Sequence, residues 1–278
     1  MSLLEVRDLS IEFGKRRVVD RVSFTLDAGE KLALVGESGS GKSVTALSLL
    51  RLIETARLSG EIVFDGQPVL QLPPAKLQAM RGRDIAVIFQ EPMTALNPIY
   101  TVGRQIAESL QLHMGMDAPR AAQGAVDALH RVGIPEPESR ARSYPHQLSG
   151  GQRQRVMIAM ALACNPRLLI ADEPTTALDV SIRLQILDLI DKLSAESGMA
   201  LLLITHDLNL VRRFSQRVAV MERGVIVEQG ATREVTASPQ HAYTKKLLDS
   251  RPQRNVGSPG EGCAVAAKQI EVDRKSVV

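Results

Sequence analysis

Residues 31–50, Lys-Leu-Ala-Leu-Val-Gly-Glu-Ser-Gly-Ser-Gly-Lys-Ser-Val-Thr-Ala-Leu-Ser-Leu-Leu, decide the fold class of this chain. The apolar run 31–35 predicts a buried strand, and residues 44–52 predict a helix. Between them, residues 36–43 fit the pattern G-x-x-x-x-G-K-[ST]. The glycines allow the backbone to curl so that successive N–H groups point at a phosphate, and the helix presents its N-terminus to the same anion. The stretch therefore predicts a phosphate-loop α/β domain.

The loop also predicts which side chains would contact a bound nucleotide. Lys42 can reach the outer phosphates, and the Ser43 hydroxyl can bind Mg²⁺. A turn that is merely rich in Gly and Ser is the alternative, but the flanking strand and helix are the context that the motif requires. The predicted nucleotide-binding residues of this segment are Gly36, Glu37, Ser38, Gly39, Ser40, Gly41, Lys42, Ser43 and Val44.

The overall composition is that of a globular protein. The chain has 278 residues, and 34 Lys and Arg against 31 Asp and Glu give a formal net charge of +3. An aromatic fraction of 3% without Trp argues against a base-stacking surface for nucleic acid. Cys164 and Cys263 are too few for a disulfide framework, which makes a reducing cytoplasmic location the default. We find no secretory signal and no apolar run near the roughly 18 residues of a membrane span.

Short apolar runs recur along the chain and alternate with helical patterns in its C-terminal half. The runs are 31–35, 62–64, 85–89, 168–171, 200–204, 218–221 and 225–227. This alternation predicts an α/β domain with a parallel sheet that is covered on both faces. Residues 4–11 and 18–26 instead alternate apolar and polar side chains, which favours an antiparallel β subdomain at the N-terminus.

The middle of the chain predicts a helical subdomain inserted into the α/β core. Apolar residues at helical spacing, such as Ile106 and Leu110, run through about residues 93–160. We therefore expect one domain over residues 1–250. Residues 251–278 combine Pro, Gly, Ser and mixed charges with little periodicity, which predicts a flexible tail.

An apolar strand with an acidic end lies at residues 168–173. In phosphate-loop NTPases a carboxylate in this setting helps to hold Mg²⁺, which makes Asp172 the candidate metal ligand. Glu173 lies just beyond the strand and is the candidate general base for water. The alternative is an acidic pair that only caps a turn, with Pro174 ending the strand.

Leu148-Ser149-Gly150-Gly151-Gln152 opens a helical run and forms a second predicted anion site. One triphosphate has a single outermost phosphate, so two such sites in one chain need an explanation. The chain resembles the ATP-binding cassette (ABC) ATPases, and this segment resembles their signature motif. The resemblance implies a head-to-tail pair of cassettes, in which each ATP lies between the phosphate loop of one protomer and the signature of the other.

Further motifs of the family follow in order, over about residues 3–250. Gln90 matches the Q-loop glutamine, which contacts Mg²⁺, and Asp179 matches the D-loop, which crosses the dimer interface. His206 matches the switch histidine that contacts the γ-phosphate. Phe13 stands where the family commonly places an aromatic ring against adenine, although a core role is the alternative for Phe in a strand. The resemblance thus implies the catalytic residues Glu173, His206, Gln90 and Lys42, and the Mg²⁺ ligands Ser43, Gln90 and Asp172.

Three local sequences resemble one group within the family, the ATPases of oligopeptide, dipeptide and nickel importers. They lie at 90–98, 144–147 and 238–244. The resemblance is greatest to the first half of the tandem ATPases of importers for peptides and microcin C. One departure is His-Ala-Tyr-Thr at 241–244, where the group usually has His-Pro-Tyr-Thr.

The C-terminal segment raises two further expectations. Many members of the group carry a cysteine cluster there, but this chain has only Cys263, so we predict no iron–sulfur cluster. Ile270-Glu271-Val272 faintly resembles Leu4-Glu5-Val6, as if a second cassette began there. Chance similarity over three residues is the alternative to that hypothesis.

The resemblance implies an ATP-hydrolysing subunit that powers uptake of peptides or related small solutes through a membrane importer, with ATP and Mg²⁺ as cofactors. Its partners would be a second cassette, either a paralogue or a copy of this chain, and two integral membrane permease subunits docked near residues 91–101. A periplasmic or lipid-anchored solute-binding protein would act indirectly, and no nucleic acid is implied. We expect a peripheral location on the cytoplasmic face of the bacterial inner membrane.

Two other function classes remain open from the sequence. One is a soluble ABC-type ATPase without a permease, such as a phosphonate-degradation component, which would share these motifs. The other is a nucleotide-gated scaffold that does not hydrolyse ATP. The presence of Glu173 and His206 argues against the scaffold.

Overall fold

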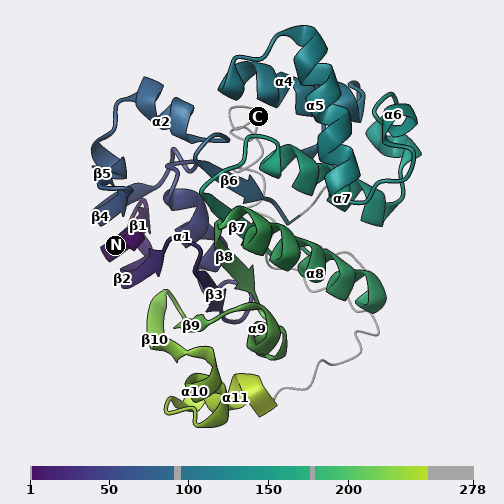
Figure 1. Ribbon diagram of the computed structural model, residues 1–278. Coiled ribbons are helices and arrows are strands. Elements are labelled where there is room, and N and C mark those ends of the chain that lie inside the picture. Colours follow the sequence, from purple (N-terminus) through teal and green to yellow (C-terminus); the bar gives the residue numbers. More distant parts are fainter. Residues whose placement is uncertain (1, 91–94, 176–178, 250–278) are drawn as a thin grey trace. The chain divides into compact units, whose positions relative to one another are not determined.

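The computed structural model describes residues 2–90, 95–175 and 179–249. The chain divides into two compact units. The first unit comprises Met1–Pro73 and Leu203–Val278, and the second comprises Pro74–Leu202. The strand β8 (Ala200–Thr205) crosses the boundary and contributes to both units. Figure 1 shows the elements and their labels.

The first unit begins with an antiparallel sheet, as the alternating N-terminal pattern predicts. Its strands follow the order β2-β1-β4-β5, and each neighbouring pair is antiparallel. Residues 62–64, which we had grouped with the α/β runs, belong to this sheet instead, because they pair with β1. The strands are β1 (Ser2–Phe13), β2 (Arg16–Asp27), β4 (Arg57–Phe64) and β5 (Gln67–Pro68).

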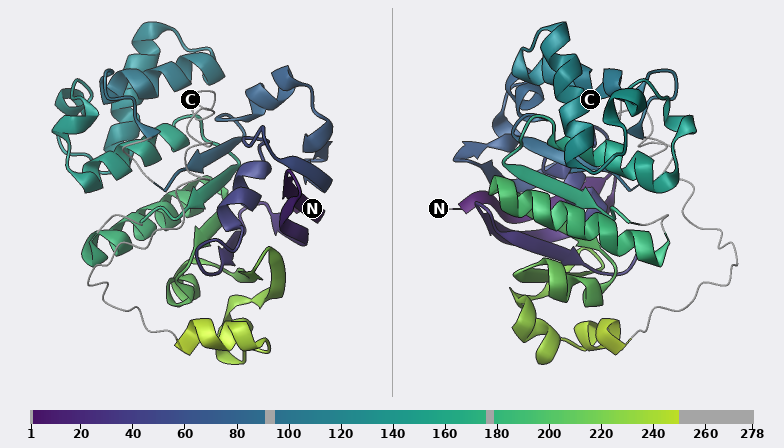
Figure 2. Two further views of the ribbon diagram at one scale, coloured as in Figure 1. Left: turned by 180° about the vertical axis from the view of Figure 1, so that it is seen from behind. Right: turned by 45° about the vertical axis from the view of Figure 1, so that its right-hand side comes forward.

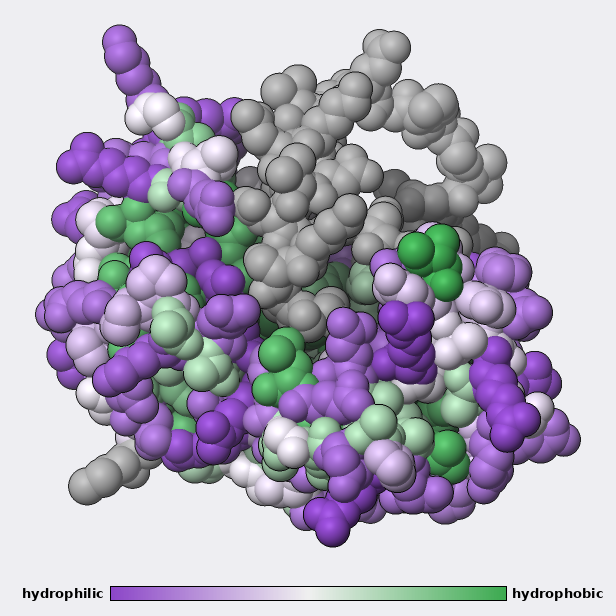
Figure 3. Space-filling model, turned by 90° about the horizontal axis from the view of Figure 1, so that it is seen from above, coloured by the Kyte–Doolittle hydropathy of each residue, from purple (hydrophilic) through white to green (hydrophobic). Residues whose placement is uncertain are grey.

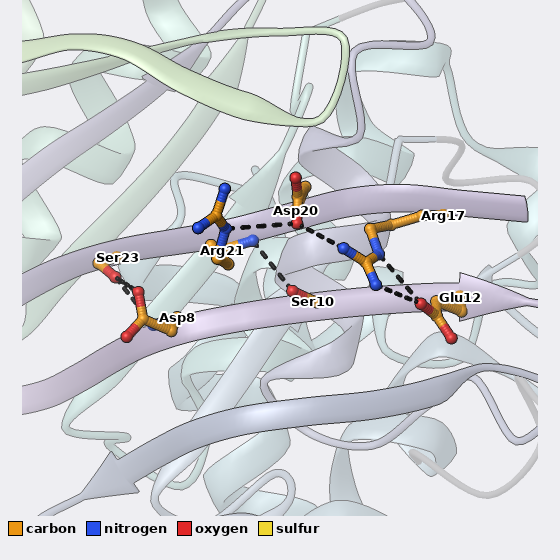
Figure 4. Close-up of polar contacts among 7 residues, drawn as sticks. All are labelled: Asp8, Ser10, Glu12, Arg17, Asp20, Arg21 and Ser23. Carbon is orange, nitrogen blue, oxygen red and sulfur yellow. Dashed lines mark hydrogen bonds and ion pairs between the residues drawn. The ribbon is translucent and has the colours of Figure 1, made fainter.

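The pairing of β1 with β2 has four register shifts. Two of them, between Val6 and Leu9 and between Leu9 and Ile11, are compensated in the same way (Figure 4). Asp8 and Arg21 have positive φ angles of 48° and 47°, so their amides turn away from the regular ladder. The Asp8 N–H donates to Ser23 Oγ at 2.8 Å, and the Arg21 N–H donates to Ser10 Oγ at 3.0 Å. A hydroxyl on the opposite strand thus replaces each lost backbone partner.

The first unit also contains the strands that lead to the phosphate loop. The local strand order is β10-β9-β3-β8, with β3 parallel to β9. The run at 225–227 forms an antiparallel edge with β9 rather than a parallel strand, because a tight turn at Gly224 joins them. The elements are β3 (Lys31–Val35), α1 (Lys42–Ser48), the 3₁₀ turn η1 (Val69–Gln71), α9 (Leu208–Phe214), β9 (Arg217–Glu222), β10 (Val225–Ala231), α10 (Thr232–Ala237) and α11 (Ala242–Asp249).

The second unit contains the other half of the parallel strands and the predicted helical segment. Its strand order is β8-β7-β6, and β6 is parallel to β7. Figure 2 shows the long helix α8 running alongside β7. The elements are α2 (Pro74–Met80), β6 (Ile85–Ile88), α4 (Val102–Met114), α5 (Ala118–Arg131), α6 (Pro137–Arg140), η2 (Pro145–Gln147), α7 (Gly150–Leu162), β7 (Leu168–Asp172) and α8 (Val180–Ser197).

Helices α4, α5 and α7 pack together through the apolar faces that the periodicity predicts. Ile106 and Leu110 of α4 are buried, as are Ala125 and Leu129 of α5 and Val156 of α7. The small side chains on α5 allow close packing, because alanine places little bulk between two helix axes. We did not predict α2, because its seven residues are too few to show a helical period.

The surface carries few large apolar side chains among the described residues. The most exposed are Ile99, Leu112, Met114, Tyr144, Leu184 and Val225. On the face in Figure 3, hydrophobic residues lie in small separate groups among hydrophilic ones. Within the described part of the chain, we find no helix with both the length and the apolar character for crossing a membrane.

The bulge at Asp8 depends on a glycine in the neighbouring strand, which gives a stability prediction. Gly60 has φ +98°, and an added Cβ would lie 2.5 Å from the Asp8 carbonyl oxygen. We expect Gly60→Ala to lower the free energy of unfolding by about 2–3 kcal/mol, as measured by urea denaturation. Gly66→Ala is the control, because Gly66 has φ +74° with open space around it, and we expect a loss of about 1 kcal/mol. Equal losses would show that the contact with Asp8 is unimportant.

Candidate functional site

The phosphate loop connects β3 to α1, as the sequence predicts, and two of its glycines are required by their surroundings. A Cβ on Gly36 would lie 2.1 Å from the carbonyl oxygen of Met221 at the end of β9. Gly41 precedes α1 with φ +101°, a conformation that side-chain-bearing residues rarely adopt. These glycines allow the loop to curl tightly against the end of the sheet.

Lys42 is buried inside this loop with 4% of its surface exposed. Its ammonium donates to the carbonyl oxygen of Gly36 at 2.8 Å and to that of Glu37 at 2.9 Å, and Ser40 Oγ lies at 3.5 Å. A buried cation needs such partners, because desolvation without them would be costly. The contacts fix a positive charge at the loop, which suits the binding of an anion.

Residues 37–39 of the loop are open to solvent, and the loop is supported on its other side. Glu37, Ser38 and Gly39 are exposed, and Ser43 is half-buried. The N–H of Gly224, in the turn between β9 and β10, donates to the Ser40 carbonyl oxygen at 3.0 Å. This turn therefore supports the side of the loop that does not face solvent.

His206 and Phe13 belong to the same unit as the phosphate loop. His206 directly follows β8 and is exposed, and the next residue is fixed by a hydrogen bond from the Asp207 N–H to Thr205 Oγ1 at 3.1 Å. Phe13 ends β1 opposite Arg16 and is half-buried, so it is not a fully buried core residue. The first unit thus contains the loop, the predicted switch histidine and the predicted adenine-contacting ring.

The acidic strand end lies in the second unit. Asp172 is the last residue of β7 and is 6% exposed, and Glu173 follows with φ +44°. This left-handed conformation is strained for a residue with a side chain, so neighbouring contacts must hold it. Gln154 of α7 is 1% exposed and donates from Nε2 to the Pro174 carbonyl oxygen at 2.7 Å. That hydrogen bond fixes the turn that carries Glu173.

The predicted signature segment forms the start of α7. Ser149 and Gln152 make a capping box, in which Ser149 Oγ accepts from the Gln152 N–H at 3.3 Å and Gln152 Oε1 accepts from the Ser149 N–H at 3.0 Å. Ser149 and Gly150 are exposed, and Gly151 is half-buried. The glycines leave the first amides of the helix without covering side chains, which suits an anion brought from outside.

The other predicted site residues also lie in the second unit. Gln90 is exposed just after β6. Asp179 is exposed and precedes α8, and its carbonyl oxygen accepts from the Arg183 N–H at 2.9 Å. Residues 91–94 of the expected docking segment, residues 177 and 178 of the D-loop motif, and the whole of 250–278, including Cys263 and 270–272, lie outside the described residues.

The structure thus groups the predicted residues into two sets. The first unit holds Phe13, the loop 36–44 and His206, and the second unit holds Gln90, Asp172, Glu173, Asp179 and 149–152. Sequence reasoning missed two supports, Gly224 and Tyr243, whose hydroxyl accepts from the Glu37 N–H at 2.8 Å. The motif at 238–244 was recognised only as a mark of the group, without a structural role.

We predicted no functional role for Cys164, and its buried environment is that of an unreactive thiol. Burial raises the pKa of its thiol to about 11, so the reactive thiolate is scarce at neutral pH. Its Sγ lies 3.7 Å from the Ser109 carbonyl oxygen, to which it can donate.

Comparison with known proteins gives a family and several close relatives. The ABC transporter family profile matches residues 19–176. The peptidoglycan transport ATP-binding protein YejF of Agrobacterium fabrum is 57% identical over 258 residues, which are 90% of this chain and 47% of that protein. The uncharacterized ABC transporter ATP-binding protein YejF of Escherichia coli is 53% identical over 283 residues, which cover 99% of this chain and 53% of that protein. The chain therefore spans about half the length of these two relatives.

A shorter relative and a solved structure extend the comparison. The dipeptide transport ATP-binding protein DppD of Escherichia coli is 48% identical over 259 residues, which are 91% of this chain and 79% of that protein. The dimeric post-hydrolysis cassette MJ0796, bound to ADP and Pi, superposes with a TM-score of 0.73 at 30% identity and covers 83% of this chain and 99% of its own.

The Gln154 contact gives a second stability prediction. Gln154→Leu keeps the size of the side chain but leaves the buried Pro174 carbonyl without this donor, so we expect a loss of about 1–3 kcal/mol in the free energy of unfolding. Gln123→Leu is the matched control, because Gln123 donates to Asp127 on an exposed helix face, and its loss should stay within about 0.5 kcal/mol. Thermal and urea unfolding of both variants would measure this. A Gln154→Leu protein as stable as the control would remove Gln154 from this role.

Proposed function

Since this chain belongs to the ABC transporter family, we propose that it is the ATP-hydrolysing subunit of a membrane importer for peptides or related small solutes. The observation that carries the proposal is the phosphate loop with the buried Lys42 ammonium at its centre. The names of its relatives, which include peptidoglycan and dipeptide transport proteins, support the solute class.

The residues of the phosphate loop fit a bound nucleotide and its metal ion. The open side of the loop, from Glu37 to Gly39, leaves room for phosphates, and Lys42 is already held as a cation beside it. In the proposal, Lys42 contacts the outer phosphates, and Ser43, Gln90 and Asp172 supply the oxygen ligands that Mg²⁺ prefers. Mg²⁺, when bound, neutralises charge that develops on the phosphoryl group. Phe13 contacts the adenine ring.

Hydrolysis requires a group that activates water and groups that stabilise charge. We assign the first role to Glu173, which directly follows β7 in a left-handed backbone conformation. Lys42 and His206 stabilise negative charge on the transferring phosphoryl group. Gln90 also senses the transport partner.

A second cassette completes the site in this proposal. Ser149, Gly150, Gly151 and Gln152 bind the nucleotide of the partner cassette, and Asp179 lies at the interface between the two. The MJ0796 structure supports this arrangement, since that cassette is dimeric and is bound to ADP and Pi. Closure of the pair is the step that drives transport, because ATP binds the closed state more tightly than the open one.

We place the permease partner at the surface of the loop that carries Ile99. Ile99 is 69% exposed there, and the loop around it is held rigidly by Gln105. Gln105 accepts from the Asn97 N–H at 2.8 Å and donates to the carbonyl oxygens of Asn97 and Tyr100, each at 3.0 Å. We propose that two integral membrane permease subunits dock here, which would place the chain peripherally on the cytoplasmic face of the bacterial inner membrane.

The domain organisation follows from the same assignment. We propose that residues 1–250 form the ABC ATPase domain, with the helical subdomain at about 93–160. A solute-binding protein outside the membrane would select the cargo, and this chain would act on it only through the permease.

The catalytic assignment predicts a separation of binding from hydrolysis. We expect Glu173→Gln to bind ATP with unchanged affinity and to hydrolyse it about 10² to 10⁴ times more slowly, because a general base contributes that much. Phosphate release in single-turnover assays would measure this. Lys42→Ala is the contrasting variant, and its ATP affinity should fall about tenfold or more, because it removes charge-assisted hydrogen bonds to the phosphates. Normal turnover by Glu173→Gln would refute the base assignment.

The transport assignment predicts membrane partners. After mild-detergent extraction from its own cells, the tagged chain should co-purify with two polytopic membrane proteins and a second cassette, identified by mass spectrometry. An Ile99→Asp chain should lose the membrane proteins and keep its ATP affinity, because Ile99 lies at the docking loop and not at the nucleotide. Recovery of soluble partners alone would favour the ATPase without a permease.

A further inference from the structure

The C-terminal helix α11 contacts the phosphate loop directly. Tyr243, the second residue of α11, is 6% exposed, and its hydroxyl oxygen accepts a hydrogen bond from the Glu37 N–H at 2.8 Å. Lys246, one turn further, forms an ion pair with the Glu37 carboxylate at 3.1 Å. Both side chains contact Glu37, the second residue of the phosphate-loop motif, which precedes them by more than 200 positions in the chain.

Helix α11 is itself fixed at its N-terminus. The Glu228 carboxylate on β10 accepts hydrogen bonds from the N–H groups of Gln240 and His241, at 2.8 Å and 3.0 Å. The ring of His241 then accepts from the Tyr243 N–H at 3.2 Å. These contacts hold the start of α11, from which the Tyr243 side chain extends. Figure 1 shows α11 beside α10 in the first unit.

Glu37 is held from both sides of its backbone. Its N–H donates to Tyr243, and its carbonyl oxygen accepts from the Lys42 ammonium at 2.9 Å. The Glu37 N–H shares its peptide group with the Gly36 carbonyl oxygen, which accepts from the Lys42 ammonium at 2.8 Å. The Tyr243 hydroxyl therefore fixes a peptide group that in turn orients Lys42. Burial, the largest cause, raises the pKa of Tyr243, so the hydroxyl stays neutral at physiological pH.

We propose that Tyr243 is a positioning residue of the phosphate loop, which pre-organises Glu37 and Lys42 for the nucleotide. The inference rests on the proposed function, because it assigns the same loop to ATP. A loop held in its binding conformation loses less conformational freedom when the ligand binds, so the contact raises affinity. Lys246 contributes little, because its ion pair with Glu37 is exposed.

The test compares two variants that each lose one tyrosine hydroxyl. In Tyr243→Phe the ring and its packing remain, and we expect the Kd for ATP to rise about 3- to 10-fold, as for the loss of one hydrogen bond. We expect kcat at saturating ATP to remain within about twofold of the wild type, since Tyr243 does not contact the reacting atoms. Tyr100→Phe is the control, and its Kd for ATP should be unchanged because Tyr100 lies in the loop near Ile99, to which the proposal assigns no contact with the nucleotide.

A second measurement reports on the contact without nucleotide. In the free full-length chain, hydrogen exchange of the Glu37 amide, followed by NMR, should be about tenfold faster or more in Tyr243→Phe than in Tyr100→Phe. If the wild type binds no ATP, the proposed function fails. If the wild type binds ATP and Tyr243→Phe binds it with equal Kd, or if Glu37 exchange is unchanged, the inference about Tyr243 is overturned while the proposed function stands.

Discussion

The burial of the Lys42 ammonium is the constraint on which the phosphate loop depends. A buried cation must find acceptors, and the carbonyl oxygens of Gly36 and Glu37 in the loop itself are among those of Lys42. For these carbonyls to point inward, the chain must curl more tightly than side chains allow, which explains the glycine packed against Met221. The burial of the Lys42 charge therefore depends on the tight curl of the loop, and the curl is stabilised by the Lys42 hydrogen bonds.

In the second unit, helix α7 supports the turn that carries Glu173. Glu173 is held in a strained backbone conformation, and Gln154 of α7 holds the following peptide through a buried hydrogen bond. The same helix begins at the capping box of Ser149 and Gln152. One rigid element thus supports the acidic turn and also presents the signature segment.

Local patterns predicted much of this arrangement, and tertiary contacts account for what they missed. The glycine spacing predicted the phosphate loop between β3 and α1, and the alternating pattern predicted the antiparallel sheet of β1 and β2. The antiparallel pairing of β10 was missed, because an apolar run does not reveal the direction of its neighbour. The contact of Tyr243 with Glu37 could not be predicted, because it depends on how Glu228 directs a helix more than 200 residues from the loop.

Ala242 stands beside Tyr243 at the one position where this motif departs from the usual sequence of the group, and the structure explains how the contact between Tyr243 and Glu37 forms without proline there. The group usually has proline at this position, and in the structure Ala242 is the first residue of α11, where proline is readily accepted because its φ suits the first turn of a helix. Alanine gives up that preset φ, but Glu228 and the His241 ring already fix the start of the helix through backbone N–H groups. If Tyr243 positions the loop as proposed, the segment depends on the tyrosine and on its support from β10, and proline is one of several residues that can begin the helix.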